Sequence, residues 1–450
     1  MITYYSTNLN IRSVTFKDAL LLGLAPDKGL FMPENIPSLT SEELYSFKDL
    51  KYADIAAKIL YKFLEGEIKY DDLLSLARDA YNFETPIEKV IDQKYILRLD
   101  SGPTASFKDY AARMMGRLMQ YFLKQENKNL VILTATSGDT GSAVANAFYN
   151  LDNIKVVILY PEKEITLRQR KQMTTLHNNI HILALKGKFD DCQALVKKAF
   201  VDKDLAHINL SSANSINIGR LLPQSVYYVY SYLKVTAQKN QEVIFSVPCG
   251  NFGNLMGGLI AKFMGLPVKK FIVATNENDE VPNYFKTGKY SLIQPSRNCI
   301  SSAMNVGHPS NMARVIALYN GIMNEKGEII KEPQLDKMKK DMFAISINDE
   351  YTRKTIIETY KQYKLLLEPH GAVAWAGLNE YLKNTNEDPD IPMISLETAH
   401  PSKFPEEIKN LLGFEPELAE SLKGLDEKEE NFTIIDNDYF VLKDYLLKNF

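Results

Sequence analysis

The sequence predicts an α/β protein in which parallel strands are connected by helices that cross back over the sheet. From about residue 90 onward, short apolar strand-like runs alternate with helix-like stretches, which is typical of this fold class. Polar and glycine-containing motifs follow several of these runs. In parallel sheets ligands bind beyond the carboxyl ends of the strands, so we expect the functional site there. The strand-like runs are Leu130–Leu133, Lys155–Tyr160, Ile180–Leu185, Ile208–Leu210, Val243–Val247, Phe271–Ala274 and Met393–Leu396.

The helix-like stretches divide the chain into two parts. Residues 1 to about 90 hold two of them, Ser41–Lys62 and Tyr70–Tyr81, with few strand signals, so we expect a mostly helical N-terminal region. Beyond that region, most strand-like runs are followed by a helix-like stretch. These stretches are Ser142–Tyr149, Thr166–His177, Asp190–Val201, Ile218–Val235 and Asn254–Phe263.

Composition and charge exclude some functions. Of the 450 residues, 45% are hydrophobic and 24% are charged, which is ordinary for a soluble globular protein with a sizeable core. The net charge of −3 gives no reason to expect binding to nucleic acid or to an anionic membrane. We therefore expect a small molecule as the partner.

Compartment and metal content can be argued in the same way. The first residues, Met1–Arg12, lack the apolar core of a signal peptide, and no uncharged apolar run reaches the roughly 20 residues that span a bilayer. The cysteines, Cys192, Cys249 and Cys299, lie too far apart for a disulfide framework or a zinc site. We expect a cytoplasmic protein that holds no metal.

Lys108 is the first candidate functional residue. It stands in the stretch Ser101–Asp109, behind a Gly-Pro turn and at the start of the helix-like run Asp109–Lys124. The dipole at a helix N-terminus disfavours an ammonium, which pushes Lys108 toward the neutral amine. A neutral amine can form a Schiff base with a carbonyl compound or with pyridoxal phosphate (PLP). Alone, this pattern fits an ordinary surface lysine in a first helical turn more often.

Two glycine-containing turns change that balance. Cys249–Asn254 follows the apolar run Val243–Pro248, and Ala135–Gly141 follows another strand-like run. At a strand-to-helix turn, glycine lets the main chain approach an anion, and free N–H groups point toward it. A single turn of this kind usually only reverses the chain. Two of them together with Lys108 favour a site for a phosphate-bearing cofactor or substrate.

The chain resembles the threonine synthases, which are PLP enzymes of the tryptophan-synthase-β-like group, or fold type II. The segments Tyr5–Thr7 and Gly23–Pro33 are the most specific, because other fold type II enzymes lack them. The chain departs from the family at Ser101, where a histidine is common, and at Cys249, where a threonine is usual. The remaining matches are Gly102–Asp109, Thr136–Gly141, Asn214–Gln224, Gly250–Asn254, Ala274–Asp279 and Thr398–Pro401.

The resemblance implies a fold and a reaction. Residues 1–90 would form the threonine synthase N-terminal domain. Residues 91–450 would form the PLP-binding catalytic region, made of two α/β subdomains of which the smaller covers about 110–215. The enzyme would be a carbon–oxygen lyase that converts O-phospho-L-homoserine and water to L-threonine and phosphate, the last step of threonine biosynthesis, through a PLP Schiff base on Lys108. It would be a monomer or a homodimer.

The resemblance also implies the residues that hold the cofactor. Lys108 would carry PLP, and Thr398 would be the partner of the pyridine nitrogen. A hydroxyl cannot keep a proton on that nitrogen as an aspartate would, so the ring would be a weaker electron sink. The cradle for the cofactor phosphate would be Gly250, Asn251, Phe252, Gly253 and Asn254.

Two further groups are candidates for substrate binding. Ser215, Asn217 and Arg220 lie at a helix start, where a fork-shaped guanidinium suits the phosphate of the substrate. A structural salt bridge is the alternative for Arg220. Residues near the second turn, namely Ser137, Gly138 and Thr140, suit a substrate carboxylate. Asp139 would repel that carboxylate, so we expect it to have a capping or orienting role. We assign no role to the histidines His308, His370 and His400.

Two other functions stay open at this point. A PLP-dependent phospho-lyase acting on the same class of substrate would give 2-oxobutanoate, and the cofactor motifs discriminate poorly between the two enzymes. A regulatory protein that binds a nucleotide or metabolite could use the glycine turns without catalysis. Lys108 argues against the regulatory protein, because such a protein needs no buried lysine amine.

Overall fold

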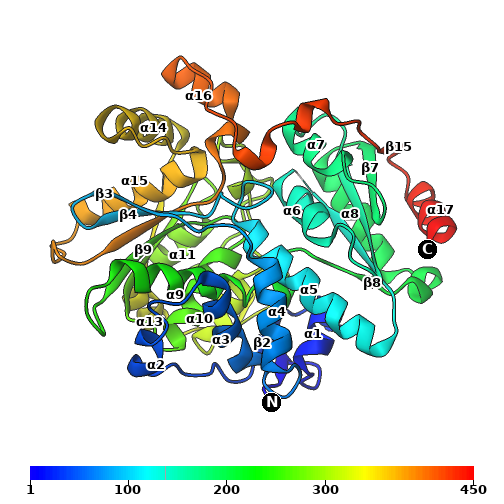
Figure 1. Cartoon of the computed structure of the whole chain (residues 1–450), viewed down its shortest axis with the longest axis horizontal. Coiled ribbons are helices and arrows are strands. Elements are labelled where there is room, and N and C mark those ends of the chain that lie inside the picture. Colours follow the sequence, from blue (N-terminus) through cyan, green and yellow to red (C-terminus); the bar gives the residue numbers. More distant parts are fainter. Residues whose placement is uncertain (137) are drawn as a thin grey trace.

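The computed structural model describes residues 1–136 and 138–450, and it contains two α/β units with a layer of N-terminal helices beneath them (Figure 1). Each unit is built on its own sheet. The order of strands is β13-β10-β9-β14-β4-β3 in the larger sheet and β15-β7-β6-β5-β8 in the smaller one. Every neighbouring pair is parallel except β3 with β4. The predicted α/β class with parallel strands is confirmed.

The larger sheet gathers strands from distant parts of the chain. Its central strand β14 (Met393–Glu397) pairs with β9 (Val243–Pro248) on one side and β4 (Lys94–Arg98) on the other. The helix α15 (Pro369–Lys383) directly precedes β14 in the chain and packs on this sheet. The remaining strands are β3 (Ile87–Ile91), β10 (Val268–Thr275) and β13 (Met342–Ser346).

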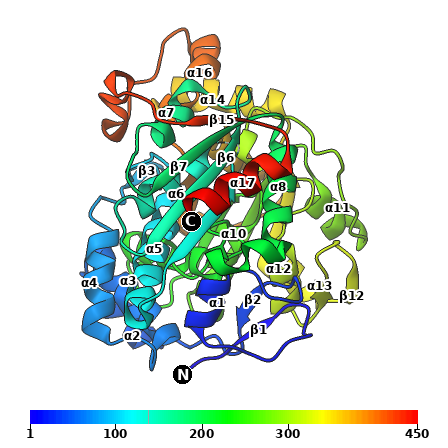
Figure 2. The same ribbon diagram turned by 90° about the vertical axis from the view of Figure 1, so that its right-hand side faces the viewer.

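The smaller sheet is covered on both faces. Its inner strands are β5 (Leu130–Ala135), β6 (Ile154–Pro161) and β7 (Ile180–Lys186), and the short β8 (Leu210–Ser211) is one of its edge strands. The helices α5 (Lys108–Glu126), α6 (Asp139–Phe148) and α7 (Leu167–Thr174) lie on one side, and α8 (Phe189–Val201) lies on the other. Figure 2 shows α8 together with α17 (Tyr439–Asn449), which follows the edge strand β15 (Thr433–Asp436).

The N-terminal region contains more than helices. The strands β1 (Tyr4–Ser6) and β2 (Phe31–Pro33) form a small antiparallel sheet, and α1 (Phe16–Leu22) lies between them in the chain. The helix α4 (Tyr70–Ala80) completes the layer. The single helix predicted over Ser41–Lys62 is wrong, since the chain forms α2 (Ser41–Tyr45) and α3 (Tyr52–Leu64) with a turn between them that buries Phe47.

One further predicted helix is interrupted. The stretch Ile218–Val235 forms a short 3-10 turn, Ile218–Arg220, and then α9 (Gln224–Val235), which begins after Pro223 because proline cannot donate a main-chain hydrogen bond inside a helix. Among the described residues, no helix is both long and apolar enough to cross a bilayer. The remaining elements are α10 (Gly253–Phe263), α11 (Glu280–Thr287), α12 (Met312–Leu318), β11 (Ile322–Met323), β12 (Ile329–Lys331), α13 (Leu335–Asp341), α14 (Asp349–Tyr363) and α16 (Pro405–Leu412).

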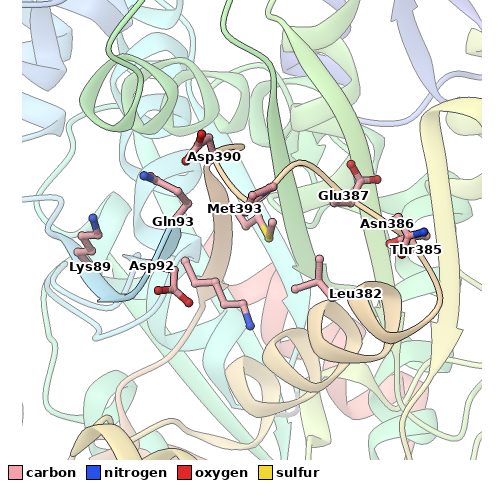
Figure 3. A pocket seen from close by; sticks show the side chains of 11 residues that line it. Lys89, Asp92, Gln93, Leu382, Thr385, Asn386, Glu387, Asp390 and Met393 are labelled. Atoms are coloured by element: carbon pink, nitrogen blue, oxygen red, sulfur yellow. The ribbon is translucent and has the colours of Figure 1, made fainter.

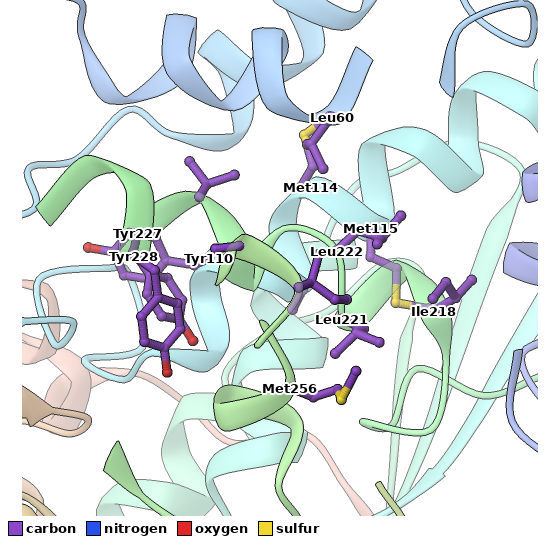
Figure 4. Close-up of a cluster of buried hydrophobic side chains, with 14 of the residues drawn as sticks. Leu60, Tyr110, Met114, Met115, Ile218, Leu221, Leu222, Tyr227, Tyr228 and Met256 are labelled. Atoms are coloured by element: carbon purple, nitrogen blue, oxygen red, sulfur yellow. The ribbon is translucent and has the colours of Figure 1, made fainter. Parts of the chain in front are cut away.

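One hydrophobic core joins the N-terminal helices to both sheets. Figure 4 shows part of it, in which Leu60 of α3 lies next to Met114 of α5, and side chains of α9 and α10 belong to the same cluster. Met115 and Tyr227 in this cluster are fully buried. Because the same core continues from the first helices into the α/β units, the N-terminal layer is bound to the rest of the protein by apolar packing.

Shortening a side chain of this core tests that packing. Leu60 is 1% exposed, so we expect Leu60→Ala to lower the free energy of unfolding by about 2–5 kcal/mol, the usual cost of such a cavity. Leu447→Ala in α17 is the matched control, because Leu447 is 43% exposed and should change stability by less than about 0.5 kcal/mol. Denaturant unfolding measures both, and equal losses would contradict the shared core.

Candidate active site

The predicted site residues meet at the carboxyl ends of strands from both sheets. Gly250–Asn254 follows β9, Thr398 follows β14, and Gly138 and Asp139 follow β5. The loop after β8 carries Ser215 and joins them, since Asn251 Nδ2 donates a hydrogen bond of 2.5 Å to the hydroxyl of Ser215. The structure therefore brings together the segments that the sequence predicted.

Lys108 is the first residue of α5, and the main chain before it is held in place. Phe107 N–H donates to the carbonyl of Thr398 at 2.9 Å, and His400 N–H donates to the carbonyl of Ala105 at 3.0 Å. The Gly102 position has to be glycine, because a Cβ there would lie 2.4 Å from a carboxylate oxygen of Asp109. The turn before the helix thus fixes where the lysine emerges.

Burial sets the protonation of Lys108. Its side chain is 12% exposed, and burial lowers the pKa of the amine below its usual value. Asp139, whose Oδ2 lies 3.6 Å from Nζ, opposes that effect, while Lys403 and Arg220 add to it. The predicted shift toward the neutral amine has the right direction, but its largest cause is burial and not the helix dipole.

The two glycines of the loop after β9 differ in what surrounds them. A Cβ on Gly250 would meet the carbonyl oxygen of Ala303 at 2.7 Å, so that glycine is required by the protein itself. A Cβ on Gly253 would meet nothing closer than 3.5 Å, and its neighbours are the amide of Gln224, the amide of Asn311 and Ser215. A methyl group would therefore fit at Gly253 in ordinary contact with these neighbours. Gly253 is the first residue of α10, where main-chain N–H groups lack helical partners and polar side chains surround them.

Asn254 supplies an unpaired donor at the same place. Its Oδ1 accepts hydrogen bonds from the hydroxyls of Tyr227 at 2.6 Å and Tyr228 at 2.7 Å. Its Nδ2 is buried and has no partner among the described residues. Phe252 in the same loop has a positive φ of 62°, which is strained for a bulky residue. The unpaired amide of Asn254 and the N-terminus of α10 fit the phosphate of a bound PLP.

Arg220 is a buried cation with an unused donor. It is 4% exposed, Nη1 donates to the carbonyl of Ala213 at 2.7 Å, and Nε has no partner within the described part of the chain. Burial lowers the pKa of its guanidinium to about 10. No ion pair with a described carboxylate forms, so the alternative of a structural salt bridge is wrong. The guanidinium is ready to bind an anion.

Its two predicted companions differ in what they can still bind. The Oγ of Ser215 accepts from Asn251, and its own hydroxyl hydrogen remains free to donate. Both amide hydrogens of Asn217 are used, because Nδ2 donates to the carbonyls of Leu20 at 2.9 Å and Ser212 at 3.0 Å. Asn217 therefore anchors the loop, and only its Oδ1, which already accepts from Gly219 N–H, could face a substrate.

The turn after β5 is held by its own hydroxyl. Thr136 Oγ1 accepts from the N–H groups of Gly138 at 3.0 Å and Gly141 at 2.8 Å. Ser137 lies outside the described residues. Thr140, in the first turn of α6, is half-buried. The N–H of Gly138 is thus committed to the turn, so it is less available to a substrate carboxylate than the sequence predicts.

The hydroxyl of Thr398 faces a buried carboxylate, Glu368, which no motif in the sequence indicates. Thr398 is 6% exposed, and its hydroxyl lies 3.4 Å from Oε1 of the fully buried Glu368. Glu368 accepts from the N–H groups of His370 at 2.8 Å and Gly371 at 3.0 Å. Only the position of Thr398 after β14 was visible in the sequence, since Glu368 is 30 residues away.

Two buried cations were also missed. Lys403 is 2% exposed, and its Nζ lies 2.7 Å from Oδ1 of Asp139. Although burial works against it, Lys403 and Lys108 hold the pKa of Asp139 below its usual value. Arg314 is fully buried, and it donates from Nε to the carbonyl of Phe31 at 3.1 Å and from Nη2 to the carbonyl of Ile216 at 2.7 Å. No motif in the sequence marks either residue.

Two open cavities are lined by residues other than those assigned above to the candidate active site. One, of about 610 Å³, lies where β4 and β14 begin, next to Lys94 and Met393, and Figure 3 shows its polar rim. The other, of about 600 Å³, runs along β3 and reaches Arg98 and His400. The first is at the amino ends of the strands, opposite to the end where Thr398 follows β14, so it is separate from the candidate active site.

Comparison with protein families gives the same answer along the whole chain. Residues 3–81 match the family model for the threonine synthase N terminus, residues 83–395 match pyridoxal-phosphate dependent enzymes, and residues 371–446 match the threonine synthase C-terminal model. The chain is 40% identical to a threonine synthase of Haemophilus influenzae over 437 residues, which are 97% of each chain.

Solved structures agree in fold and sequence. PLP-bound threonine synthase from Brucella melitensis superposes with a TM-score of 0.93 at 34% identity, covering 99% of each chain. Threonine synthase from Escherichia coli gives a TM-score of 0.88 at 36% identity over the full length of both chains. These likenesses confirm the predicted fold type II enzyme and its PLP cofactor. The chain belongs to the threonine synthase family of PLP-dependent enzymes.

Proposed function

We propose that this chain makes L-threonine and phosphate from O-phospho-L-homoserine and water, with Lys108 as the residue that binds PLP and moves the substrate's Cα proton. The observation that carries the proposal is the buried amine of Lys108, whose pKa is lowered and whose nearest carboxylate oxygen is 3.6 Å away. An amine whose pKa is lowered is deprotonated more easily, and the neutral amine can attack a carbonyl group or accept a proton.

The residues that would hold the cofactor come from three segments. Lys108 would bind it covalently, the loop Gly250–Asn254 would receive its phosphate, and Thr398 would meet the ring nitrogen. When bound, PLP draws electrons away from the substrate's Cα and makes the neighbouring protons acidic. The N-terminus of α10 at Gly253 and the unpaired Nδ2 of Asn254 support this arrangement.

The chain's own residues account for two parts of the reaction, the transfer of the Cα proton and the binding of the substrate phosphate. The Lys108 amine would take the proton from Cα, since the residue that binds the cofactor would lie close to that carbon. Arg220 binds the phosphate of the substrate through its unused Nε, and the hydroxyl of Ser215 adds a donor. Fixed donors of this kind orient the leaving phosphate and stabilise its charge as it departs. Water must then add at Cβ before the product leaves.

The phospho-lyase alternative is not favoured. It would share Lys108 and the phosphate loop, but it would release the keto acid 2-oxobutanoate in place of threonine. The match of residues 3–81 to the threonine synthase N terminus supports the synthase. We propose a monomer or homodimer that acts in the cytoplasm and binds no nucleic acid. The three cysteines, all buried and free, fit a reducing compartment.

Two glycine substitutions separate cofactor binding from folding. Gly253→Ala should reduce the affinity for PLP, because the added methyl group enters the space proposed for the phosphate, while the melting temperature of the PLP-free protein stays near that of the wild type. Gly250→Ala is the control and should lower the melting temperature, since its Cβ meets a carbonyl oxygen at 2.7 Å. Unchanged PLP affinity in Gly253→Ala would contradict the assignment of the loop.

Removing the Arg220 guanidinium should weaken substrate binding. We expect Arg220→Met to lower kcat/KM for O-phospho-L-homoserine, mainly by raising KM, with the cofactor spectrum unchanged. The fall in kcat/KM should correspond to a loss of about 2–4 kcal/mol in transition-state binding. Arg314→Met is the comparison, because that buried guanidinium donates to main-chain carbonyls and its loss should reduce stability. Steady-state kinetics and thermal melting measure the two effects, and wild-type kinetics in Arg220→Met would refute the role.

Product analysis tests the overall reaction. With O-phospho-L-homoserine as the only substrate, we expect one L-threonine for each phosphate released. Amino-acid analysis, a phosphate assay and a keto-acid assay are run on the same samples. If 2-oxobutanoate and ammonia account for most of the released phosphate, the phospho-lyase is the correct function.

A further inference from the structure

A second buried lysine lies beside Lys108, and the proposed reaction gives it no task. Lys403 stands in the 3-10 turn Pro401–Lys403, just after Thr398. It is 2% exposed, and its Nζ lies 2.7 Å from Oδ1 of Asp139 and donates to the carbonyl of Thr104 at 3.1 Å. Lysines are almost never this deeply buried without a partner, so Asp139 is the group that balances its charge.

Asp139 is shared unequally between the two lysines. Its Oδ1 lies 2.7 Å from Nζ of Lys403 and also accepts from Nε2 of Gln169 at 3.1 Å. Its Oδ2 lies 3.6 Å from Nζ of Lys108, which is longer than a normal hydrogen bond. Lys403 therefore holds the carboxylate, and Lys108 has only a loose contact with it.

Charged groups face Lys108 from three other elements. Asp139 comes from α6, Lys403 from the turn after β14, and Arg220 from the 3-10 turn after β8. Only one of the three is an acid. The carboxylate next in the chain, Asp109, accepts from both the N–H and the hydroxyl of Thr104 and so faces its own loop. The surroundings of Lys108 are thus buried and carry more positive than negative charge.

We propose that Lys403 is a positioning residue that holds the Asp139 carboxylate and thereby leaves the Lys108 amine without a tight ionic partner. An amine without such a partner loses its proton more easily, which is what attack on a carbonyl group and removal of a Cα proton both require. The inference rests on the role proposed for Lys108. Its test measures only the protonation of an amine, so it can fail or succeed independently of that role.

Replacing Lys403 should have two effects of the same sign. In Lys403→Met, Asp139 loses its close partner and can approach Lys108, and a neighbouring positive charge disappears. Both changes favour the ammonium form, so the pKa of Lys108 should rise. Lys403→Arg keeps the charge and should stay close to the wild type. Asp139→Asn removes the acid and should move the pKa of Lys108 downward.

The protonation of Lys108 can be measured directly in the full-length protein freed of PLP. Each variant is treated with a trace of acetic anhydride over a series of pH values, and mass spectrometry compares acetylation of Lys108 with that of the exposed Lys354. The pH midpoint of Lys108 reactivity reports its pKa. In Lys403→Met we expect the midpoint to rise by about one unit, so that at any pH well below both midpoints about tenfold fewer amines are neutral.

Folding controls keep the outcome decisive. Circular dichroism and thermal melting are recorded for every variant. A native spectrum with an unchanged midpoint in Lys403→Met would mean that the contact with Asp139 is only structural, and the proposal would be wrong. If Lys403→Met does not fold, Lys403→Gln decides, because it also removes the positive charge that holds Asp139, and an unchanged midpoint there overturns the proposal. Borohydride reduction of the PLP-loaded wild type tests the cofactor role of Lys108 separately.

Discussion

A short antiparallel contact between two distant segments determines where the chemistry can occur. The turn before Lys108 pairs with the segment after β14 through the bridge of Ser106 with Ala399 and two main-chain hydrogen bonds that flank it. These bonds join residues almost 300 positions apart in the sequence. They bring the lysine at the start of α5 next to Thr398 and Lys403, so the geometry of the site follows from main-chain pairing before any side chain is considered.

Burial of positive charge is the second constraint on the site. Lys108, Lys403 and Arg220 are all largely removed from water, and Asp139 is the one carboxylate that the two lysines share. Burying charges without full compensation is costly, and a protein keeps them where an anion will arrive. A phosphorylated cofactor and a phosphorylated substrate each bring such an anion.

The N-terminal layer takes part in this arrangement as well as in packing. The buried Arg314 donates to the carbonyl of Phe31 in β2 and to the carbonyl of Ile216 in the loop after β8. Asn217 in the same loop donates to the carbonyl of Leu20 in α1. The loop that carries Arg220 is therefore held on one side by the N-terminal region, which includes Phe31 of the family-like segment Gly23–Pro33. This contact gives a physical reason for the pairing of that N-terminal segment with a PLP-binding region.

The sequence alone determined the class of fold and the segments of the site. Apolar runs alternating with helices are a local pattern, and so are a lysine behind a Gly-Pro turn and glycines after a strand. Such patterns predicted the parallel sheets, Lys108 and the loop Gly250–Asn254. Tertiary structure decided the rest. The edge strand β15, with one buried residue, has almost no pattern of its own, and its place depends on β7. The partners of Lys403, Arg314 and Glu368, and the burial that lowers the pKa of Lys108, exist only after distant segments have packed, because burial and charge proximity are properties of the folded chain.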